Sequence, residues 1–111
     1  MSRKEQVHKS SGNVFKDIAC LHPERLLARS KIMLRVTEII RERHLTQEKA
    51  AKILGIPQSK VSCLMNGKLS QFSLEHLFAL LNALDSDVQI VIKPKSKEEK
   101  IATTNVLLAA A

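Results

Sequence analysis

The sequence predicts a mainly helical bundle of four to five helices, with one β-strand near its C-terminal end. Apolar residues recur at spacings of three and four over 23–43 and 73–84, and a glycine separates two shorter helical segments between them. β-Branched residues alternate over 87–93, which predicts the strand. A chain of 111 residues can form one compact domain of about 80 residues with additional ends.

The first 22 residues divide into a polar and an apolar part. Residues 1–12 are charged and end in Ser-Ser-Gly, so we expect a disordered arm, whose Arg3, Lys4 and Lys9 are candidates for contacts with phosphates. Residues 13–22 are too apolar to remain free in water, since they carry Val14, Phe15, Ile18 and Leu21. We expect them to pack on the domain or on a partner, with Phe15 as a core plug or as a partner anchor.

A long helix is predicted from Pro23 to about Arg43, because proline is favoured in the first turn of a helix. Its buried stripe consists of Leu26, Ile32, Met33, Val36, Ile39 and Ile40. Arginines lie mostly off this stripe, where they form a solvated face or contact phosphates; they are Arg25, Arg29, Arg35, Arg41 and Arg43. This helix is expected to brace the segment that follows it.

The segment Leu45–Gly67 has the pattern of two short helices joined by a tight turn. Thr46 can cap the first helix, and the small Ala51 is expected where the two helices cross. Gly55 follows two apolar residues, at a position where a left-handed residue ends a helix at low cost. Pro57 then suits the start of the second helix.

The second short helix is expected to have one apolar and one polar face. Val61, Leu64 and Met65 face inward, which leaves Gln58, Ser59, Ser62 and Asn66 outward. A helix over these residues is about 13 Å long, and the major groove of B-DNA is about 12 Å wide. Because Gln, Ser and Asn both donate and accept hydrogen bonds, we interpret the outward face as a surface that contacts DNA bases.

The last helix and the strand complete the predicted domain, residues 13–93. Ser73 can cap a helix with a broad apolar face, and Asp85-Ser86 ends it. In the strand 87–93, one face carries Val88, Ile90 and Ile92. A lone strand needs a partner, so we predict strand pairing between two chains in a twofold homodimer. The alternative is that residues 13–18 supply the second strand within one chain.

Residues 94–111 are rich in lysine and alanine and predict a flexible tail. Its Ala-rich part, residues 101–111, can form a short helix only when a partner is present.

The segment Leu45–Gly67 resembles the helix-turn-helix of the phage-repressor family (Cro/CI, or XRE), and residues 13–94 resemble its antitoxin subgroup. The resemblance rests on NVFKDI at 13–18, Leu26-Leu27-Ala28, IIRERHLTQ at 39–47 and FSLEHLFALLNALDSDVQIVI at 72–92. It implies that Gln47 contacts phosphate and supports Gln58, that Gln58, Ser59 and Ser62 face bases, and that Lys60 and Lys68 lie near phosphates. Cys63 occupies a position at which the family pattern has no fixed residue.

Two functions are expected: the helix-turn-helix segment supports the first directly, and only the resemblance implies the second. The first is a dimeric, sequence-specific repressor that binds a palindromic operator in double-stranded DNA through the major groove. The second is an antitoxin that masks a RelE-like toxin, through residues 13–27 or the C-terminal tail, and represses its own operon. A stand-alone regulator without a toxin is the alternative to this antitoxin.

Composition agrees with a nucleic-acid partner and gives no support to catalysis. The formal net charge of +7 suits a polyanion, and no stretch has the roughly 18 to 20 apolar residues of a membrane span. No signal peptide opens the chain, so we expect it in the cytoplasm with reduced Cys20 and Cys63. The histidines are scattered and there is no glycine-rich phosphate loop, so we expect no metal, no cofactor and no enzymatic activity.

Overall fold

The computed structural model describes residues 23–109, which form four α-helices and one short 3-10 helix. In chain order these are α2 (Pro23–Glu42), α3 (Gln47–Leu54), α4 (Gln58–Met65), η1 (Leu69–Gln71) and α5 (Leu74–Ala83). The mainly helical prediction is therefore confirmed, while residues 23–109 contain no β-strand. The predictions for the arm 1–12 and for residues 13–22, including Phe15 and the alternative strand, lie outside the described residues.

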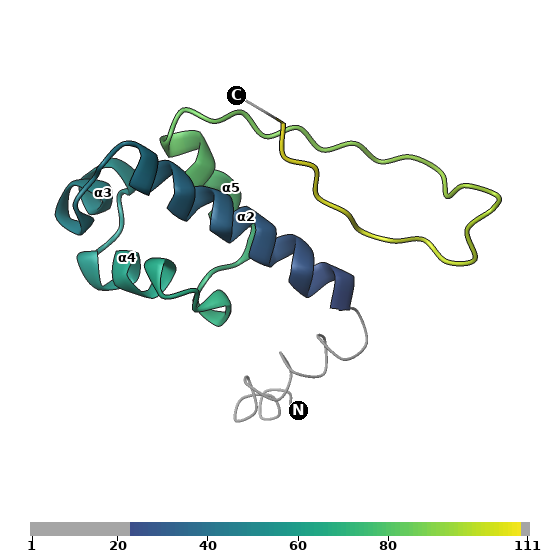
Figure 1. The fold of residues 1–111 in the computed structure, drawn as a ribbon, viewed down its shortest axis with the longest axis horizontal. Coiled ribbons are helices and arrows are strands. Elements are labelled where there is room, and N and C mark those ends of the chain that lie inside the picture. The colour runs from purple at the N-terminus through teal and green to yellow at the C-terminus, as the bar shows by residue number, and fades with distance from the viewer. Residues whose placement is uncertain (1–22, 110–111) are drawn as a thin grey trace, which may run out of the picture.

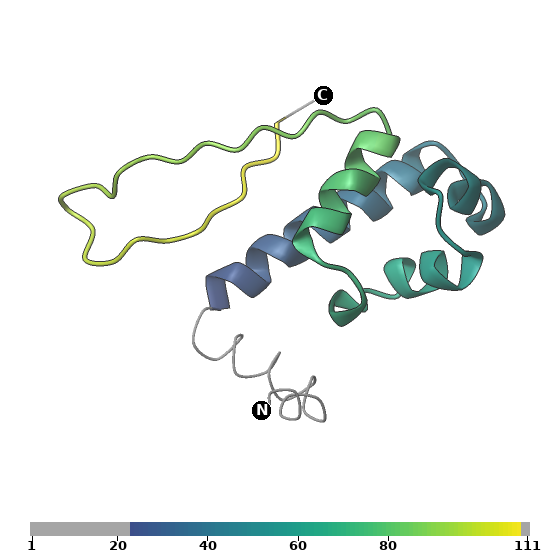
Figure 2. The same ribbon diagram turned by 180° about the vertical axis from the view of Figure 1, so that it is seen from behind.

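Helix α2 crosses the middle of the helical body, with α3 and α4 on one side of it (Figure 1). Helix α5 lies behind α2 in this view and in front of it in Figure 2, and the two helices pack against each other. The predicted stripe of α2 is confirmed from Ile32 to Ile40, whereas Leu26 is only half-buried. α2 therefore braces α4 and α5.

The core lies between α2, α4 and α5. Six residues of the core cluster are completely inaccessible to solvent, among them Ala50 of α3: Val36, Ala50, Val61, Leu64, Leu77 and Leu84. Phe72, between η1 and α5, is 2% exposed and joins the same cluster. Full burial of such side chains stabilises the fold by about 1.5–3 kcal/mol each, so the core fixes how α4 is held.

All four α-helices end in the same backbone motif, with a left-handed residue just beyond the helix. These residues are His44, Gly55, Gly67 and Asp85, with φ between 54° and 71°. After each of them, the next N–H donates to a carbonyl five residues back, for example Ile56 to Ala51 at 3.2 Å and Lys68 to Cys63 at 3.1 Å. The predicted glycine end of α3 is confirmed, and Gly67 follows α4 in the same way. His44 and Asp85 adopt the same left-handed conformation although each of them carries a side chain.

Replacing Gly55 by alanine is expected to lower the free energy of unfolding by about 1–2 kcal/mol. A Cβ at Gly55 would meet no atom within 4 Å, so the penalty comes from its φ of 70° and not from crowding. Chemical denaturation measures the change. His44→Gly is the matched control: it removes a side chain from a left-handed residue and should not destabilise the chain. Equal stability of Gly55→Ala and the unmutated chain would contradict this account.

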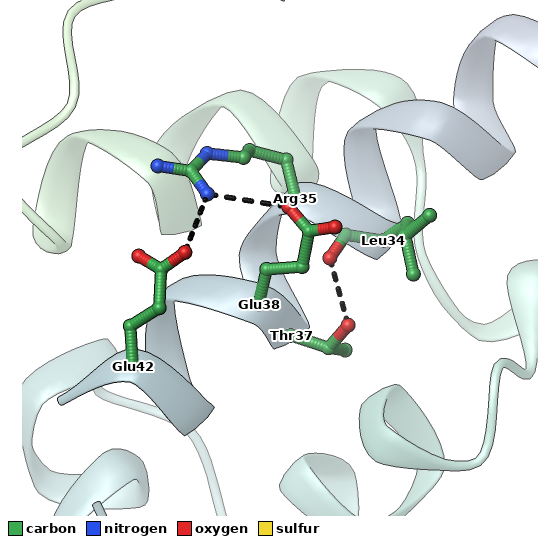
Figure 3. A network of polar contacts seen from close by, with 5 residues as sticks. All are labelled: Leu34, Arg35, Thr37, Glu38 and Glu42. Atoms are coloured by element: carbon green, nitrogen blue, oxygen red, sulfur yellow. Dashed lines mark hydrogen bonds and ion pairs between the residues drawn. The ribbon is translucent and has the colours of Figure 1, made fainter. Parts of the chain in front are cut away.

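Arg35 organises a polar network on the exposed side of α2 (Figure 3). Its Nη1 donates to Glu38 and to Glu42, both at 3.2 Å, and these hydrogen bonds raise the pKa of Arg35 above its ordinary value. Nearby, the hydroxyl of the buried Thr37 donates to the carbonyl of Leu34 at 2.8 Å. Exposed ion pairs of this kind contribute about 0.2–1 kcal/mol each, so the network supports α2 only modestly.

Arg43 joins the end of α2 to the end of α5. Its guanidinium donates to the carbonyl of Leu84, and Nη1 lies 4.0 Å from the Asp85 carboxylate. A cation is favourable at a helix C-terminus, where carbonyl groups lack partners within the helix. The structure therefore gives Arg43 a capping role within the fold.

The strand predicted over 87–93 is not shown in the single chain. These residues have no regular secondary structure, because in a single chain no neighbouring strand receives their backbone hydrogen bonds. The chain runs outward from α5 and then back, so that Val88 and Val106 both pack against the core (Figure 1). Residues 101–109 form no helix either.

Candidate nucleic-acid interface

Local sequence signals position α3 and α4 as predicted. The Thr46 hydroxyl accepts a hydrogen bond from the N–H of Lys49 at 3.1 Å, which caps α3. Pro57 is the residue just before α4, with extended backbone angles. The fully buried small residue of α3 is Ala50 at 0% exposure, whereas Ala51, expected at the helix crossing, is half-buried beside the core.

Helix α4 has two different faces. Val61 and Leu64 are completely buried, and they fix the helix on the core. The opposite face is polar: Gln58, Ser59 and Asn66 are exposed, and Ser62 is half-exposed. Eight residues at 1.5 Å per residue make α4 about 12 Å long, which matches the width of the major groove.

This polar face keeps its hydrogen-bonding groups unused. The side chains of Gln58, Ser59, Ser62 and Asn66 form no hydrogen bond with any other residue of the described range 23–109. Each can both donate and accept, which is what contact with base edges requires. We therefore name these four residues the polar row of α4.

The residues predicted to contact phosphates beside α4 differ in their exposure and contacts; they are Gln47, Lys60 and Lys68. Gln47, the first residue of α3, is exposed and makes no hydrogen bond with Gln58, so the predicted support between them remains a prediction. Lys68 is exposed at the start of η1. Lys60 is turned toward Gln71 and Phe72, which sequence reasoning missed because no local spacing connects these residues.

The charge around α3 and α4 is positive. From Leu45 to Gln71 there are four lysines and one glutamate, a formal charge of 4 − 1 = +3. Three of the lysines, Lys49, Lys52 and Lys68, are exposed. Such a surface attracts a polyanion over a distance of about one Debye length, near 8 Å at physiological salt.

Other types of site are not found in the part of the chain that the structure describes. Residues 23–109 contain no group of three or more His, Cys, Asp or Glu side chains placed to hold a metal ion. Over the same residues, no helix is both long and apolar enough to cross a membrane.

Comparisons with known proteins agree with this geometry. A family model described as a helix-turn-helix domain matches residues 14–93. A solved structure named as an XRE-family transcriptional regulator is 42% identical, and the match covers 75% of this chain and 93% of that chain with a TM-score of 0.72. No curated protein matches this sequence.

Helices α3 and α4 with the turn between them define the class of DNA-binding helix-turn-helix proteins, and the matched family model confirms the helix-turn-helix domain. The chain belongs to this helix-turn-helix family, in its XRE branch.

Proposed function

We propose that the chain is a sequence-specific transcriptional repressor that inserts α4 into the major groove of its operator. The observation that supports this proposal is the polar row of α4, whose side chains make no hydrogen bond with another residue of the range 23–109, on a helix that is fixed from behind by the fully buried Val61 and Leu64. A helix held rigidly from behind presents its outer side chains in fixed positions, which base recognition requires. Acting on the genome, the protein would work in the cytoplasm.

We assign the individual contacts from exposure and position. Gln58 begins α4, and its amide can make a paired contact with adenine, while Ser59, Ser62 and Asn66 extend the same face. Gln47 and Lys68 lie exposed at the start of α3 and of η1, where they would contact phosphates. Phosphate contacts supply affinity, and the polar row supplies selectivity.

We also propose that two copies pair through residues 87–93. Val88 is held against the core, while Ile90, Val91 and Ile92 are 66%, 80% and 91% exposed. An extended apolar segment with unpaired backbone groups is a template for a second strand. A twofold dimer would present two α4 helices to a palindrome whose half-sites lie about 34 Å apart, or a multiple of it.

A second candidate function is that of an antitoxin. Pairing through 87–93 does not by itself account for the exposed apolar residues Ile101, Leu107 and Leu108, which are 70%, 88% and 51% exposed. A partner protein such as a RelE-like toxin would cover them. Co-expression with the product of a neighbouring gene tests this candidate: a stable complex and relief of growth arrest support an antitoxin, while no complex leaves the stand-alone regulator.

Selection of binding sites from a pool of randomised duplexes tests the proposed repressor. We expect enrichment of a palindromic sequence with half-sites about one helical turn apart, or a multiple of one turn. The quadruple variant in which the whole polar row is alanine is the matched control, because its core and lysines are unchanged. Failure of the unmutated chain to enrich any sequence would contradict sequence-specific binding.

A further inference from the structure

Lys60 lies in the first turn of α4 but does not belong to its polar row. Its Nζ donates to the backbone carbonyl of Gln71 at 2.8 Å and lies 4.9 Å from the centroid of the Phe72 ring. Gln71 ends η1, and Phe72 precedes α5. The ammonium group therefore connects the start of α4 to the segment between η1 and α5.

The partners of Lys60 are themselves fixed. Phe72 is 2% exposed, its N–H donates to Leu69 at 3.1 Å, and its ring lies 5.4 Å from the ring of His76. An ammonium over an aromatic face is attracted electrostatically by the ring, in addition to its hydrogen bond. To reach a phosphate by leaving this position, Lys60 would have to give up both contacts.

We propose that Lys60 is a positioning residue, which sets the orientation of α4 on η1 and thereby that of Gln58, and that it does not neutralise a phosphate. Gln58 is two residues away in the same helical turn. The side chain of Lys68, in contrast, is exposed and has no hydrogen-bond or ion-pair partner among the described residues, so the phosphate contact falls to Lys68. This inference rests on the proposed DNA-binding function.

The test compares Lys60→Met with Lys68→Met, because methionine keeps an unbranched side chain and removes the charge. Binding to the selected duplex and to a scrambled duplex is measured over a range of salt concentrations. For Lys60→Met we expect the affinity for the selected duplex to fall about fivefold or more, which is the low end of the effect of one base contact. The affinity for the scrambled duplex, and the slope of log affinity against log salt concentration, should not change. For Lys68→Met we expect weaker binding to both duplexes and a slope smaller by about 0.9.

Lys60→Arg provides the rescue, because a guanidinium can donate to the same carbonyl and stack on the same ring. We expect it to bind the selected duplex as the unmutated chain does. Circular dichroism at the assay temperature establishes that each variant is folded; should Lys60→Met unfold, the uncharged Lys60→Gln, whose amide still donates, takes its place. A slope reduced by about 0.9 for either uncharged variant, or equal weakening on both duplexes, would overturn the positioning role.

The unmutated chain distinguishes failure of the proposed DNA-binding function from failure of the positioning role. If that chain binds both duplexes equally, the proposed function fails, and the role of Lys60 in base recognition fails with it. If the unmutated chain discriminates and only the Lys60 variants behave otherwise than expected, the positioning role alone is overturned.

Discussion

Replacing Ile90 by aspartate is expected to convert the proposed dimer to monomers and to weaken operator binding by about 10²- to 10⁴-fold. Ile90 is 66% exposed in the single chain and would lie on the same face of a paired strand as Val88. In a twofold pair, the two aspartates would be buried near each other without cationic partners. Because the side chain lies outside the helical core, the helical content should not change.

Val91→Asp is the matched control for this prediction. Val91 is 80% exposed and would point to the opposite face of a paired strand, so this variant should remain dimeric. Sedimentation velocity measures both states, and titration with the selected duplex measures affinity. A dimer that persists in Ile90→Asp would contradict pairing through residues 87–93, and monomers in both variants would contradict the assignment of faces.

Replacing Gln58 by alanine is expected to weaken binding to the selected duplex by about 1–3 kcal/mol and to leave binding to a scrambled duplex unchanged. Gln58 is exposed and its side chain makes no hydrogen bond with another described residue, so the change removes no support from the fold. Alanine also has a high helix propensity, which preserves α4.

Gln47→Ala is the comparison for Gln58→Ala. Gln47 is an exposed glutamine at the first position of α3, where we propose a phosphate contact. Its replacement should weaken binding to both duplexes by similar factors, because phosphates carry no sequence information. Fluorescence anisotropy titration of each variant measures the two affinities. Equal losses on both duplexes for Gln58→Ala would contradict its assignment to a base.

Local signals explain why much of this fold could be predicted from the sequence. At Thr46 and Ser73, the side-chain hydroxyl caps a helix by accepting a hydrogen bond from the N–H three residues later. At Gly55 and Gly67, the helix ends because glycine tolerates a positive φ. The buried faces of α2 and α4 follow from helical periodicity. All of these features involve neighbours within one or two turns.

Features that depend on distant residues were not predictable in this way. Arg43 caps a helix that ends 41 residues later in the chain, and Lys60 meets a carbonyl 11 residues away across η1. Neither contact has a sequence spacing of its own, because each depends on how the helices pack. The strand over 87–93 is not shown in the single chain for a related reason: its alternation is a property of the segment, but its hydrogen bonds require a neighbour.

The central claim, that α4 recognises a DNA sequence, is tested most directly by titrating the unmutated protein with the DNA upstream of its own gene and with a scrambled duplex. At about 0.15 M salt, specific complexes typically have a Kd of about 10⁻⁸ to 10⁻¹¹ M, and non-specific ones about 10⁻⁴ to 10⁻⁶ M. We predict that the upstream DNA falls in the first range and the scrambled duplex in the second. Equal, weak binding to both would contradict recognition by this protein alone.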